Sequence, residues 1–369
     1  MTFHASNNCG SMLQAYALQK TLLNLGYKNE IVDYSNKAQR HMYALFRFPT
    51  NYHDVLHDIS AIILYSVFKK HNDSYIEFKK KNFLLSSKSI KNHFELDKIK
   101  DDYDIFIAGS DQVWNTNCPD ADDAYYLNFT ENKKVAYAPS FGNTNINCET
   151  KNPILYKTYL DSFTGISIRE ENGAKWIERL TGKKCPVLLD PSLLLDMNEY
   201  IKLAGKERVI KEKYIFYYAF SYSDEVNAYV EKISKQLQLP VYIIDAKNWL
   251  KRAWKYKIKL YKESGPCVFL NLLFNAELVL TTSFHGTAFS LIAEKKFWFI
   301  DSSMRNPEDD RALTLLKSVC LENRMLLGEE LLKKDLNEII KYKEVNTLLE
   351  EKKAISINWL AEQLEQCAR

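Results

Sequence analysis

The chain has 369 residues, of which 46% are hydrophobic and 26% are charged, and its formal net charge at pH 7 is +3. This balance is typical of a soluble globular protein, and the small net charge argues against a nucleic-acid-binding protein. A chain of this length is long for one hydrophobic core, so we expect two domains.

The cysteines, histidines and apolar runs exclude several further classes. The seven cysteines are scattered and contain no CxxC pair, which indicates a reducing, cytoplasmic compartment rather than a disulfide framework or a zinc ribbon. The histidines form no HExxH motif, and the spacing of His53 and His57 alone does not predict a metal site. No apolar run is long enough to span a membrane, and the N-terminus has no signal-peptide pattern.

The first predicted elements follow a β-α-β rhythm. "MTFH" resembles the end of a strand, which raises the expectation that the native N-terminus extends upstream. Residues 11–25 are apolar at helical spacing and are followed by Gly26, and "EIVDY" is an extended run. Residues 36–100 interrupt the rhythm and hold 12 Lys and Arg against 6 Asp and Glu. We expect an inserted helical excursion there, aromatic and basic.

From residue 101 onward, short apolar runs alternate with helical patterns. The first series contains "YDIFIAGSDQVWN", "KVAYAPSFG", "GISIREENGAKWIERL" and "PVLLDPSLLL". A second series begins near Lys213 and continues through "AELVLTTSFHG" and "KFWFID", and the chain after about Glu329 is charged and helical. This alternation predicts an α/β fold with a parallel sheet in each half, in Rossmann-like domains at residues 1–200 and 201–369.

Clusters of polar residues follow several of these apolar runs. They are "HASNNCG", "GSDQVWN", "SFG", "REE" and "SFHG". In open parallel sheets, ligands bind beyond the carboxyl ends of the strands. We therefore expect these clusters to line one ligand-binding site at the carboxyl ends of the strands.

The first two clusters each have two local interpretations. In "SNNCGS", Gly10 and Ser11 either present backbone N–H groups to an anion or form a capped helix start with Ser11 as the cap. In "GSDQVWN", Asp111 either accepts a proton or hydrogen bond from a sugar hydroxyl, with Trp114 as a stacking face, or caps the next turn together with Ser110.

Arg169 also has two local interpretations. It follows the apolar run "GISI", so its guanidinium is expected at the end of a strand, where a forked cation suits a carboxylate or phosphate. An ion pair with Glu170 or Glu171, the next two residues, is the alternative.

His285 lies on a predicted strand-to-helix turn. Gly286 permits close approach of the backbone, Ser283 and Thr287 supply hydroxyl groups, and the following helix directs its positive end to the same place. An imidazole there could deliver a proton at neutral pH, or it could be a structural turn histidine bonded to the backbone.

The ordered set of motifs resembles the polysaccharide pyruvyltransferase family. The resemblance is carried by "TFHASNNCGSMLQAYALQ", "DIFIAGSDQVWN", "VAYAPSFG", "SIREENG", "LDPSLLL", "NAELVLTTSFHGTAFSLI" and "INWLAEQL". It implies a two-domain architecture like that of GT-B glycosyltransferases, with the active site in the interdomain cleft. It also implies a transferase that needs no cofactor, takes phosphoenolpyruvate as donor, forms a cyclic pyruvate ketal on a sugar diol and releases phosphate.

The resemblance assigns roles to the residues around the turn. His285 is similar to the family's active-site histidine and is the expected acid that protonates the donor methylene. Arg169 is similar to an arginine that holds the donor, which favours the anion-binding interpretation. Gly286 and Thr287 are expected to receive phosphate oxygens.

One position departs from the family's pattern. Relatives often carry an arginine two residues before the histidine, whereas this chain has Ser283. Arg311 or Arg305, in the following loop, is expected to replace the missing charge.

The acceptor is expected on the other side of the cleft. Asn8, Gly10, Ser110, Asp111 and Gln112 belong to that half, with Asp111 as the expected base. The resemblance implies a galactose- or mannose-type residue on a lipid-linked or nucleotide-linked precursor of a surface, exopolysaccharide or capsular polymer. The basic insert either contacts an anionic membrane at the inner face or is a solvated helical face.

Two other functions remain open from the sequence. A GT-B glycosyltransferase would bind a nucleotide sugar in the second domain, where His285 and its helix could hold the phosphates. A non-catalytic glycan-binding subunit of a polymer assembly would need neither His285 nor Arg169 for its activity.

Overall fold

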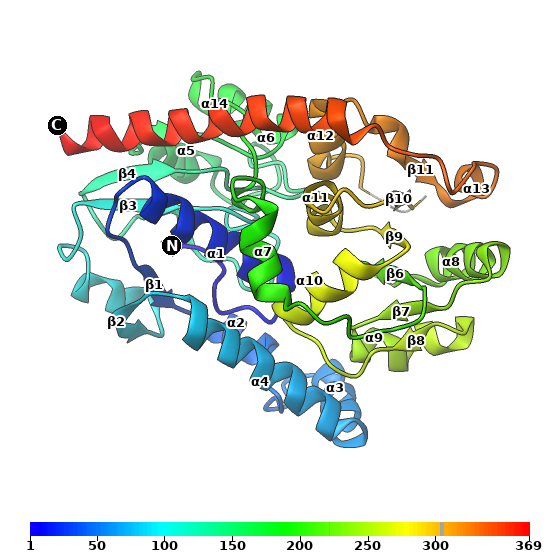
Figure 1. The fold of residues 1–369 in the computed structure, drawn as a ribbon. Helices are drawn as coiled ribbons and strands as arrows, with labels where there is room; N and C mark the ends of the chain where they lie inside the picture. The colour runs from blue at the N-terminus through cyan, green and yellow to red at the C-terminus, as the bar shows by residue number, and fades with distance from the viewer. Residues whose placement is uncertain (221, 303–305) are drawn as a thin grey trace.

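The chain folds into two α/β units that lie side by side, joined at the top of the view by the last helix (Figure 1). The computed structural model describes residues 1–220, 222–302 and 306–369. Within these ranges no helix is both long enough and apolar enough to cross a bilayer. The fold class predicted from the sequence, α/β with parallel sheets, is confirmed.

The C-terminal unit is built on one six-stranded sheet in which every pairing is parallel. Its strands are β6 (Ile215–Tyr218), β7 (Val241–Ile243), β8 (Lys259–Leu260), β9 (Leu278–Thr281), β10 (Phe297–Asp301) and β11 (Met325–Leu327). Their spatial order, β11-β10-β9-β6-β7-β8, is the Rossmann order 3-2-1-4-5-6. The switch point of this sheet, where ligands bind, therefore lies between β6 and β9 at their carboxyl ends.

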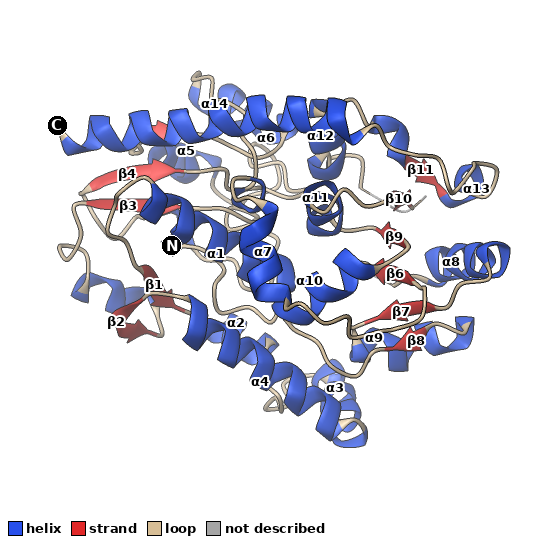
Figure 2. Ribbon diagram, in the orientation of Figure 1, coloured by secondary structure: helices blue, strands red, loops and turns tan. Residues whose placement is uncertain are grey.

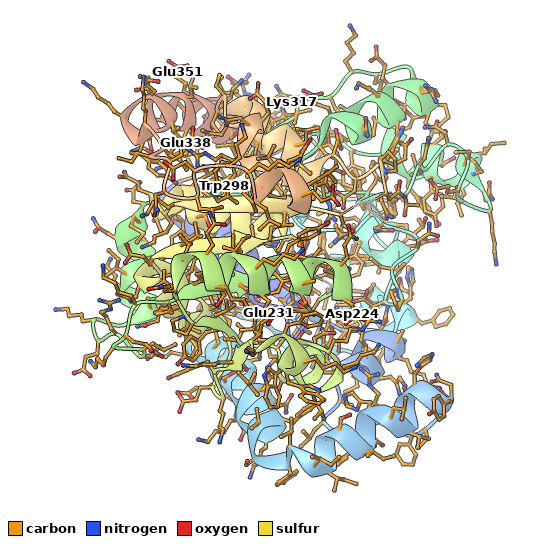
Figure 3. The ribbon with its side chains drawn as sticks, turned by 90° about the vertical axis from the view of Figure 1, so that its right-hand side faces the viewer. Asp224, Glu231, Trp298, Lys317, Glu338 and Glu351 are labelled. Carbon is orange, nitrogen blue, oxygen red and sulfur yellow. The ribbon has the colours of Figure 1, made fainter. Side chains whose placement is uncertain are left out.

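Helices cover both faces of this sheet (Figure 2). They are α8 (Asp224–Leu237), α9 (Ala246–Lys251), α10 (Pro266–Asn275), α11 (Phe284–Ile292), α12 (Arg311–Ser318) and α13 (Gly328–Leu331). The last helix, α14 (Tyr342–Ala368), runs along the other unit. Figure 3 views this unit from its outer side, with α8 in front carrying Asp224 and Glu231. β9 is buried at all four positions, as expected for a strand covered on both faces.

The N-terminal unit contains two smaller parallel sheets, β3-β4-β5 and β1-β2. Its strands are β1 (Ile31–Tyr34), β2 (Leu85–Ile90), β3 (Ile105–Ala108), β4 (Lys133–Ala136) and β5 (Gly165–Ile166). Met1 pairs with β3, because its amino group donates to Ile107 O at 2.8 Å and Gly109 N–H donates to Met1 O at 3.1 Å. Met1 therefore lies beside β3, but residues 1–8 form no strand, so the prediction of a strand end at "MTFH" is not confirmed.

The helices of this unit complete the first half of the chain. They are α1 (Cys9–Asn24), α2 (Lys37–Met42), α3 (Tyr52–Ile63), α4 (Tyr65–Asn82), α5 (Pro153–Asp161), α6 (Glu171–Thr181) and α7 (Met197–Ala204), with short 3₁₀ turns at His93–Lys98, Asp123–Tyr126 and Pro191–Leu193. α1 begins at the N-cap Asn8, whose side chain accepts from Ser11 N–H at 3.2 Å. The predicted cap, Ser11, is therefore wrong, since Ser11 lies inside the first turn.

The insert at residues 36–100 is only partly helical. α2, α3 and α4 confirm its first part, whereas residues 85–90 form β2 beside β1. The sequence "LSSKSI" conceals this strand because β2 lies at the edge of its sheet, and its middle residues 87–89 are exposed and polar. The prediction of a wholly helical excursion is therefore wrong at its C-terminal end.

A shared apolar core joins the two units. It includes Leu13 of α1, Leu270 of α10, Ala288 of α11 and Leu360 of α14. α14 starts in the C-terminal unit and returns along the N-terminal one, where Ser356 Oγ accepts from Leu189 N–H at 3.1 Å. The shared core holds the carboxyl ends of strands from both units close together.

Candidate active site

A buried carboxylate, Asp190, gathers groups from both units. Arg169 Nη1 donates to Asp190 Oδ2 at 2.5 Å, and His285 Nε2 lies 3.7 Å from the same oxygen. Ser192 donates to Oδ1 through its hydroxyl at 2.7 Å and its backbone N–H at 2.9 Å. Ser110 Oγ lies 3.3 Å from Oδ2. We call Asp190, Arg169 and His285 the Asp190 cluster.

The cluster is almost inaccessible to solvent and keeps hydrogen-bonding capacity. Arg169 is 3% exposed, Asp190 1% and His285 7%. Burial raises the pKa of Asp190, but the opposite effect of His285 and Arg169 is larger. The pKa of Asp190 therefore lies well below its usual range, and the carboxylate is ionised at neutral pH. Among the described residues, Nε and Nη2 of Arg169 and Nε2 of His285 have no hydrogen-bond partner. Buried donors of this kind are costly unless a ligand uses them.

Asp190 was missed by the sequence analysis. "LDPSLLL" contains it directly after an apolar run, a signal that could have marked it as a site residue. The local ion pair predicted as an alternative for Arg169 is wrong, because Arg169 bonds Asp190 rather than Glu170 or Glu171. Ile168 and Val187 form a parallel β-bridge, and this pairing brings Asp190 close to Arg169.

Asp111 lies next to the cluster and links it to α1. Ser11 Oγ donates to Asp111 Oδ2 at 2.5 Å, and Gln112 N–H donates to Oδ1 at 2.9 Å. Arg169 Nη2 is 3.8 Å from Oδ1. Asp111 is therefore brought to the site as predicted, with both carboxylate oxygens already engaged.

The imidazole of His285 is held between two units. A Cβ added to Gly10 of α1 would overlap the His285 ring at Nδ1 and Cγ, so only glycine permits this approach. Phe284 lies edge-on to the ring at 5.2 Å between centroids, and its face carries the Arg169 guanidinium at 4.2 Å. Gly10 therefore acts in positioning the histidine, a role different from the predicted anion contact.

The residues around His285 differ partly from their predicted roles. Ser283 is the N-cap of α11 and accepts from Gly286 N–H at 3.5 Å. Thr287 is fully buried, and its hydroxyl donates to Ser283 O at 3.1 Å. A Cβ at Gly286 would overlap Thr281 of β9. Gly286 and Thr287 therefore pack inside the helix and donate to Ser283, which corrects the expectation that they present free donors to phosphate.

Several side chains of the "GSDQVWN" cluster are buried or already hydrogen-bonded, so they are not free to contact a substrate. Ser110 is buried and its hydroxyl donates to Ala138 O at 2.5 Å, while Gln112 accepts from Asn115 Nδ2 at 3.0 Å. Trp114 is 0% exposed and stacks on Tyr126 with the ring planes 3° apart. The prediction that Trp114 offers a stacking face to a sugar is therefore wrong, because the neighbouring aromatic residues bury it.

Arg311 lies near the site at the start of α12. Asp309 binds its guanidinium at both Nε, at 2.7 Å, and Nη2, at 2.6 Å. Burial lowers the pKa of Arg311, but Asp309 above all, with Glu170 and Asp111, raises it above its usual range. These influences place Arg311 within electrostatic reach of Asp111. Arg305, the other predicted replacement, lies outside the described residues.

Glu170 is a second buried carboxyl that the sequence analysis did not assign. It is 0% exposed, its Oε1 accepts from Phe141 N–H at 2.7 Å, and its Oε2 has no partner among the described residues. Burial raises its pKa to about 7, while Arg169 opposes the shift. Glu170 therefore changes charge near neutral pH beside the Asp190 cluster.

This pKa predicts the pH dependence of stability. The unfolded carboxyl ionises near pH 4.5 and the folded one near 7, so stability falls as pH rises between these values. Glutamine at this position cannot ionise, so the variant Glu170→Gln should not lose stability over this range. Its free energy of unfolding, compared with that of the parent at the same pH, should therefore rise by about 3 kcal/mol between pH 4 and 8. Denaturant unfolding at both pH values measures it. Glu171→Gln, an exposed neighbour with the same charge change, should show no such rise; a parallel pH response of the two variants would refute the assignment.

The two units also meet beside Glu170, at the start of α6. Asn172 N–H donates to Asp310 Oδ2 at 3.0 Å, and the Asn172 side chain donates to Glu308 O at 3.1 Å. Glu171 N–H lies 3.4 Å from Thr314 Oγ1. The loop before α12 therefore caps a helix of the other unit.

One cavity is lined by residues of the cluster, and two others are lined by residues next to it in the chain. One of about 340 Å³ is lined by Asn8, Ser283 and residues of the insert, of the end of β6 and of the segment that follows β7. A second of about 250 Å³ is lined by Arg169, Asp190 and Phe284 with α12 and α14. A third of about 450 Å³ contains Arg311 and Phe284. The described residues include no group of three or more His, Cys, Asp or Glu side chains that could hold a metal ion.

The comparison with protein families decides the assignment. The family model for polysaccharide pyruvyl transferases matches residues 8–304. The chain belongs to this family. The match includes Arg169, Asp190 and His285, and it ends before Arg311. The predicted resemblance is thereby confirmed, and family membership implies transferase activity in polysaccharide synthesis.

Comparisons with individual proteins are more distant. No curated protein matches the chain. Among solved structures, it is similar to UDP-GlcNAc 2-epimerase from Methanocaldococcus jannaschii, with 14% identity, a TM-score of 0.47 and coverage of 79% of this chain and 89% of that one. It is also similar to the glycosyltransferase SnogD from Streptomyces nogalater, with 9% identity, a TM-score of 0.44 and coverage of 97% of both chains. The wall teichoic acid polymerase TagF matches at 8% identity and a TM-score of 0.42, over 98% of this chain and 94% of that one.

Proposed function

We propose that this member of the family transfers pyruvate from phosphoenolpyruvate to two hydroxyls of a sugar in a surface or capsular polysaccharide precursor. The products are a cyclic ketal and phosphate. The observation that carries the proposal is the Asp190 cluster, in which a buried guanidinium and a buried imidazole retain unpartnered nitrogen atoms beside an ionised carboxylate. A donor that carries a carboxylate and a phosphate can use these atoms.

The first proposed step is protonation of the donor. His285 Nε2 gives a proton to the methylene carbon, which becomes a methyl group and leaves a cation at the adjacent carbon, stabilised by its oxygen. Asp190, 3.7 Å from Nε2, orients the ring and balances the charge of an imidazolium. Arg169 holds the donor anion through Nε and Nη2, the atoms that Asp190 does not occupy.

The remaining steps form the ketal. One sugar hydroxyl attacks the cationic carbon and the bond from that carbon to the phosphate oxygen breaks. The second hydroxyl then attacks the same carbon and closes the ring. Of the two hydroxyl protons, one replaces the proton that His285 supplied and the other leaves on phosphate. Asp111 is the proposed base, with Ser11 as its hydrogen-bonded neighbour.

Arg311 is proposed to supply the charge that Ser283 lacks. Ser283 caps α11 in this chain, so its position supports the helix instead of the donor. Arg311 lies in a cavity wall with Phe284, the residue on which Arg169 stacks. This placement supports a second cation near the donor, held in orientation by Asp309.

The proposal is tested by incubating the protein with phosphoenolpyruvate and a panel of galactosides and mannosides. We expect release of inorganic phosphate that depends on the acceptor, together with an acceptor mass increase that corresponds to one pyruvyl ketal. Hydrolysis of a nucleotide sugar with no phosphate release across the panel would contradict the proposal.

A glycosyltransferase is the second candidate. The strand order of the C-terminal sheet is the one that binds nucleotides at its switch point, and a cavity lies there. The same assay, supplied with nucleotide sugars instead of phosphoenolpyruvate, separates the two activities.

A further inference from the structure

α3 turns its polar face toward the protein and its apolar face toward solvent. Its buried residues are Asp54, His57 and Ala61, which follow one another at helical spacing. The opposite face exposes large apolar side chains at the same spacing: Tyr52, Val55, Leu56, Ile59, Ile62 and Ile63. A helix at a protein surface ordinarily packs its apolar face on the core. The orientation of α3 is therefore the reverse of the usual one, and its apolar face is available to a partner.

The apolar surface continues beyond both ends of α3. Phe46 and Phe48 precede the helix and are 47% and 91% exposed. Tyr65, at the start of α4, is 47% exposed and stacks on Phe46 with 6.2 Å between the ring centroids. Single apolar residues are ordinary on a protein surface, whereas a contiguous group marks an interaction site. We call these three residues, together with the exposed face of α3, the α3 patch.

The insert itself supplies positive charge next to the α3 patch. Its helical part, residues 37–82, contains eight Lys and Arg against four Asp and Glu. Lys69 and Lys70, in α4, are exposed. Asp54 and Asp58 are the two carboxylates of α3: the first is buried 3.6 Å from Arg47, and the second accepts from Arg47 N–H at 2.9 Å. Both carboxylates are therefore occupied within the insert, and the excess charge is positive.

The C-terminal unit adds a second basic segment beside α3. Residues 246–262, which form α9, a 3₁₀ turn at Ala253–Tyr256 and β8, contain seven Lys and Arg and no Asp or Glu. Lys247 of α9 lines the same cavity as His57 of α3, so the two helices are neighbours. Both lie at the lower edge of the molecule (Figure 1). The α3 patch therefore has basic residues from both units around it.

Acidic neighbours offset only part of the charge of this segment. Among the described residues, the carboxylates bonded to it or next to it in the chain are Glu212, Asp224, Asp245 and Glu263. Asp245 accepts from Asn248 N–H and Nδ2, both at 2.8 Å. Glu263 lies 4.0 Å from Lys70 in an exposed pair, which screens little charge. The seven cations of the segment therefore outnumber these four carboxylates.

From these observations we infer that the α3 patch and the basic segment 246–262 form one docking surface for an anionic lipid bilayer. The inference goes beyond the proposed function and does not depend on it. α3 has 12 residues, too few to span a bilayer, so it lies in the plane of the interface with its apolar side chains between the headgroups. The lysines of the segment face the lipid phosphates. Trp254, 54% exposed within this segment, is of a residue type enriched at membrane interfaces.

A second copy of the chain is the alternative occupant, and the charge argues against it. A two-fold contact would bring two α3 patches together, and with them two basic borders that repel each other. Anionic headgroups instead neutralise these borders. A lipid surface therefore fits both the apolar and the basic part of this face, whereas a second copy fits only the apolar part.

Vesicle binding by the full chain tests the inference. Co-sedimentation would use vesicles of phosphatidylcholine alone and vesicles of phosphatidylcholine mixed with phosphatidylglycerol. We expect binding to the mixed vesicles that salt weakens, and much weaker binding to phosphatidylcholine alone. The double variant Ile62→Asn with Ile63→Asn should lower the partition coefficient for mixed vesicles about 10-fold or more, because two apolar side chains no longer enter the bilayer. Lys251→Ala with Lys255→Ala should lower it about 10-fold or more as well.

Matched control variants change the same residue types elsewhere on the surface. Ile154→Asn with Ile339→Asn replaces two isoleucines outside the α3 patch that are 77% and 82% exposed, and this variant should bind like the parent. Lys333→Ala with Lys334→Ala removes two exposed charges outside the basic segment and should also bind like the parent. All four double variants change exposed residues, so each is expected to fold, and thermal unfolding verifies it.

Several results would overturn the inference. They are equal binding to both kinds of vesicle, no binding by the parent, and binding to mixed vesicles that survives Ile62→Asn with Ile63→Asn. Sedimentation velocity without lipid adds a further one, since a dimer that this variant dissociates would show that a second copy covers the patch. Phosphate release from phosphoenolpyruvate with a soluble galactoside is measured separately, and its outcome bears only on the proposed function.

Discussion

His285→Ala is expected to reduce turnover by about 10²- to 10⁴-fold, the range typical for removal of a positioned proton donor. The imidazole lies between Gly10 of one unit and Asp190, and its Nε2 has no partner among the described residues. Alanine leaves Arg169 and its pair with Asp190 in place, so binding of the donor should persist better than turnover. Steady-state phosphate release gives kcat, and calorimetry gives the affinity for phosphoenolpyruvate.

His53→Ala is the matched control for this variant. His53 is an exposed histidine of α3, and its replacement should leave turnover unchanged. Thermal unfolding of both variants shows whether each is folded. Full turnover in a folded His285→Ala protein would refute the acid role.

Asp190→Ala is expected to lower the free energy of unfolding by about 3–5 kcal/mol, the cost of removing one partner of a buried ion pair. Arg169 would keep a buried charge whose nearest remaining carboxylate is Asp111, at 3.8 Å. Ser192 would also lose its acceptor. Turnover should fall as well, because both Arg169 and His285 are oriented by this carboxylate. Denaturant unfolding near pH 7 measures the stability loss.

The effect of Asp190 should also depend on pH. The folded pKa is held below its usual range, so Asp190 contributes stability above the unfolded pKa of about 3.9, and that contribution is lost as pH falls through the folded value. The difference between parent and Asp190→Ala should therefore be constant from about pH 5 to 8 and shrink in acid.

Asp196→Ala provides the comparison for Asp190. Asp196 forms an exposed pair with Lys353, and pairs of that kind contribute at most about 1 kcal/mol. If Asp190→Ala were no more destabilising than Asp196→Ala, Asp190 would not be the centre of the cluster.

Much of the local structure could be predicted from the sequence. The apolar run before His285 is β9, and α1 and β1 also lie where their patterns placed them. α11 begins earlier than predicted, at Phe284, so His285 lies in the first turn of the helix. These elements depend on periodicities of 2 and 3.6 that contacts within a few residues enforce. β2 was missed because an exposed edge strand carries no such apolar pattern.

The candidate site could be predicted only in part, for a different reason. His285, Arg169 and Asp111 each follow an apolar run. They were predicted to lie together because ligands of open parallel sheets bind beyond the carboxyl ends of the strands. Neither Trp114 nor Thr287 was available there, because burial depends on packing against neighbours that no local pattern specifies. The predicted ion pair of Arg169 with an adjacent glutamate was also wrong. The glutamates are its nearest acidic residues along the chain, but its partner in the fold is Asp190.

The sequence by itself determined the family, the α/β class and the residue types of the site, because motif order and apolar periodicity are written along the chain. Only the tertiary structure decided which groups meet. Ser11 reaches Asp111 across 100 positions, Gly10 packs on His285 from the other unit, and Glu170 holds its proton to about pH 7 because the fold buries it. Each of these depends on distance and dielectric environment, quantities that arise when the two units pack around a shared core.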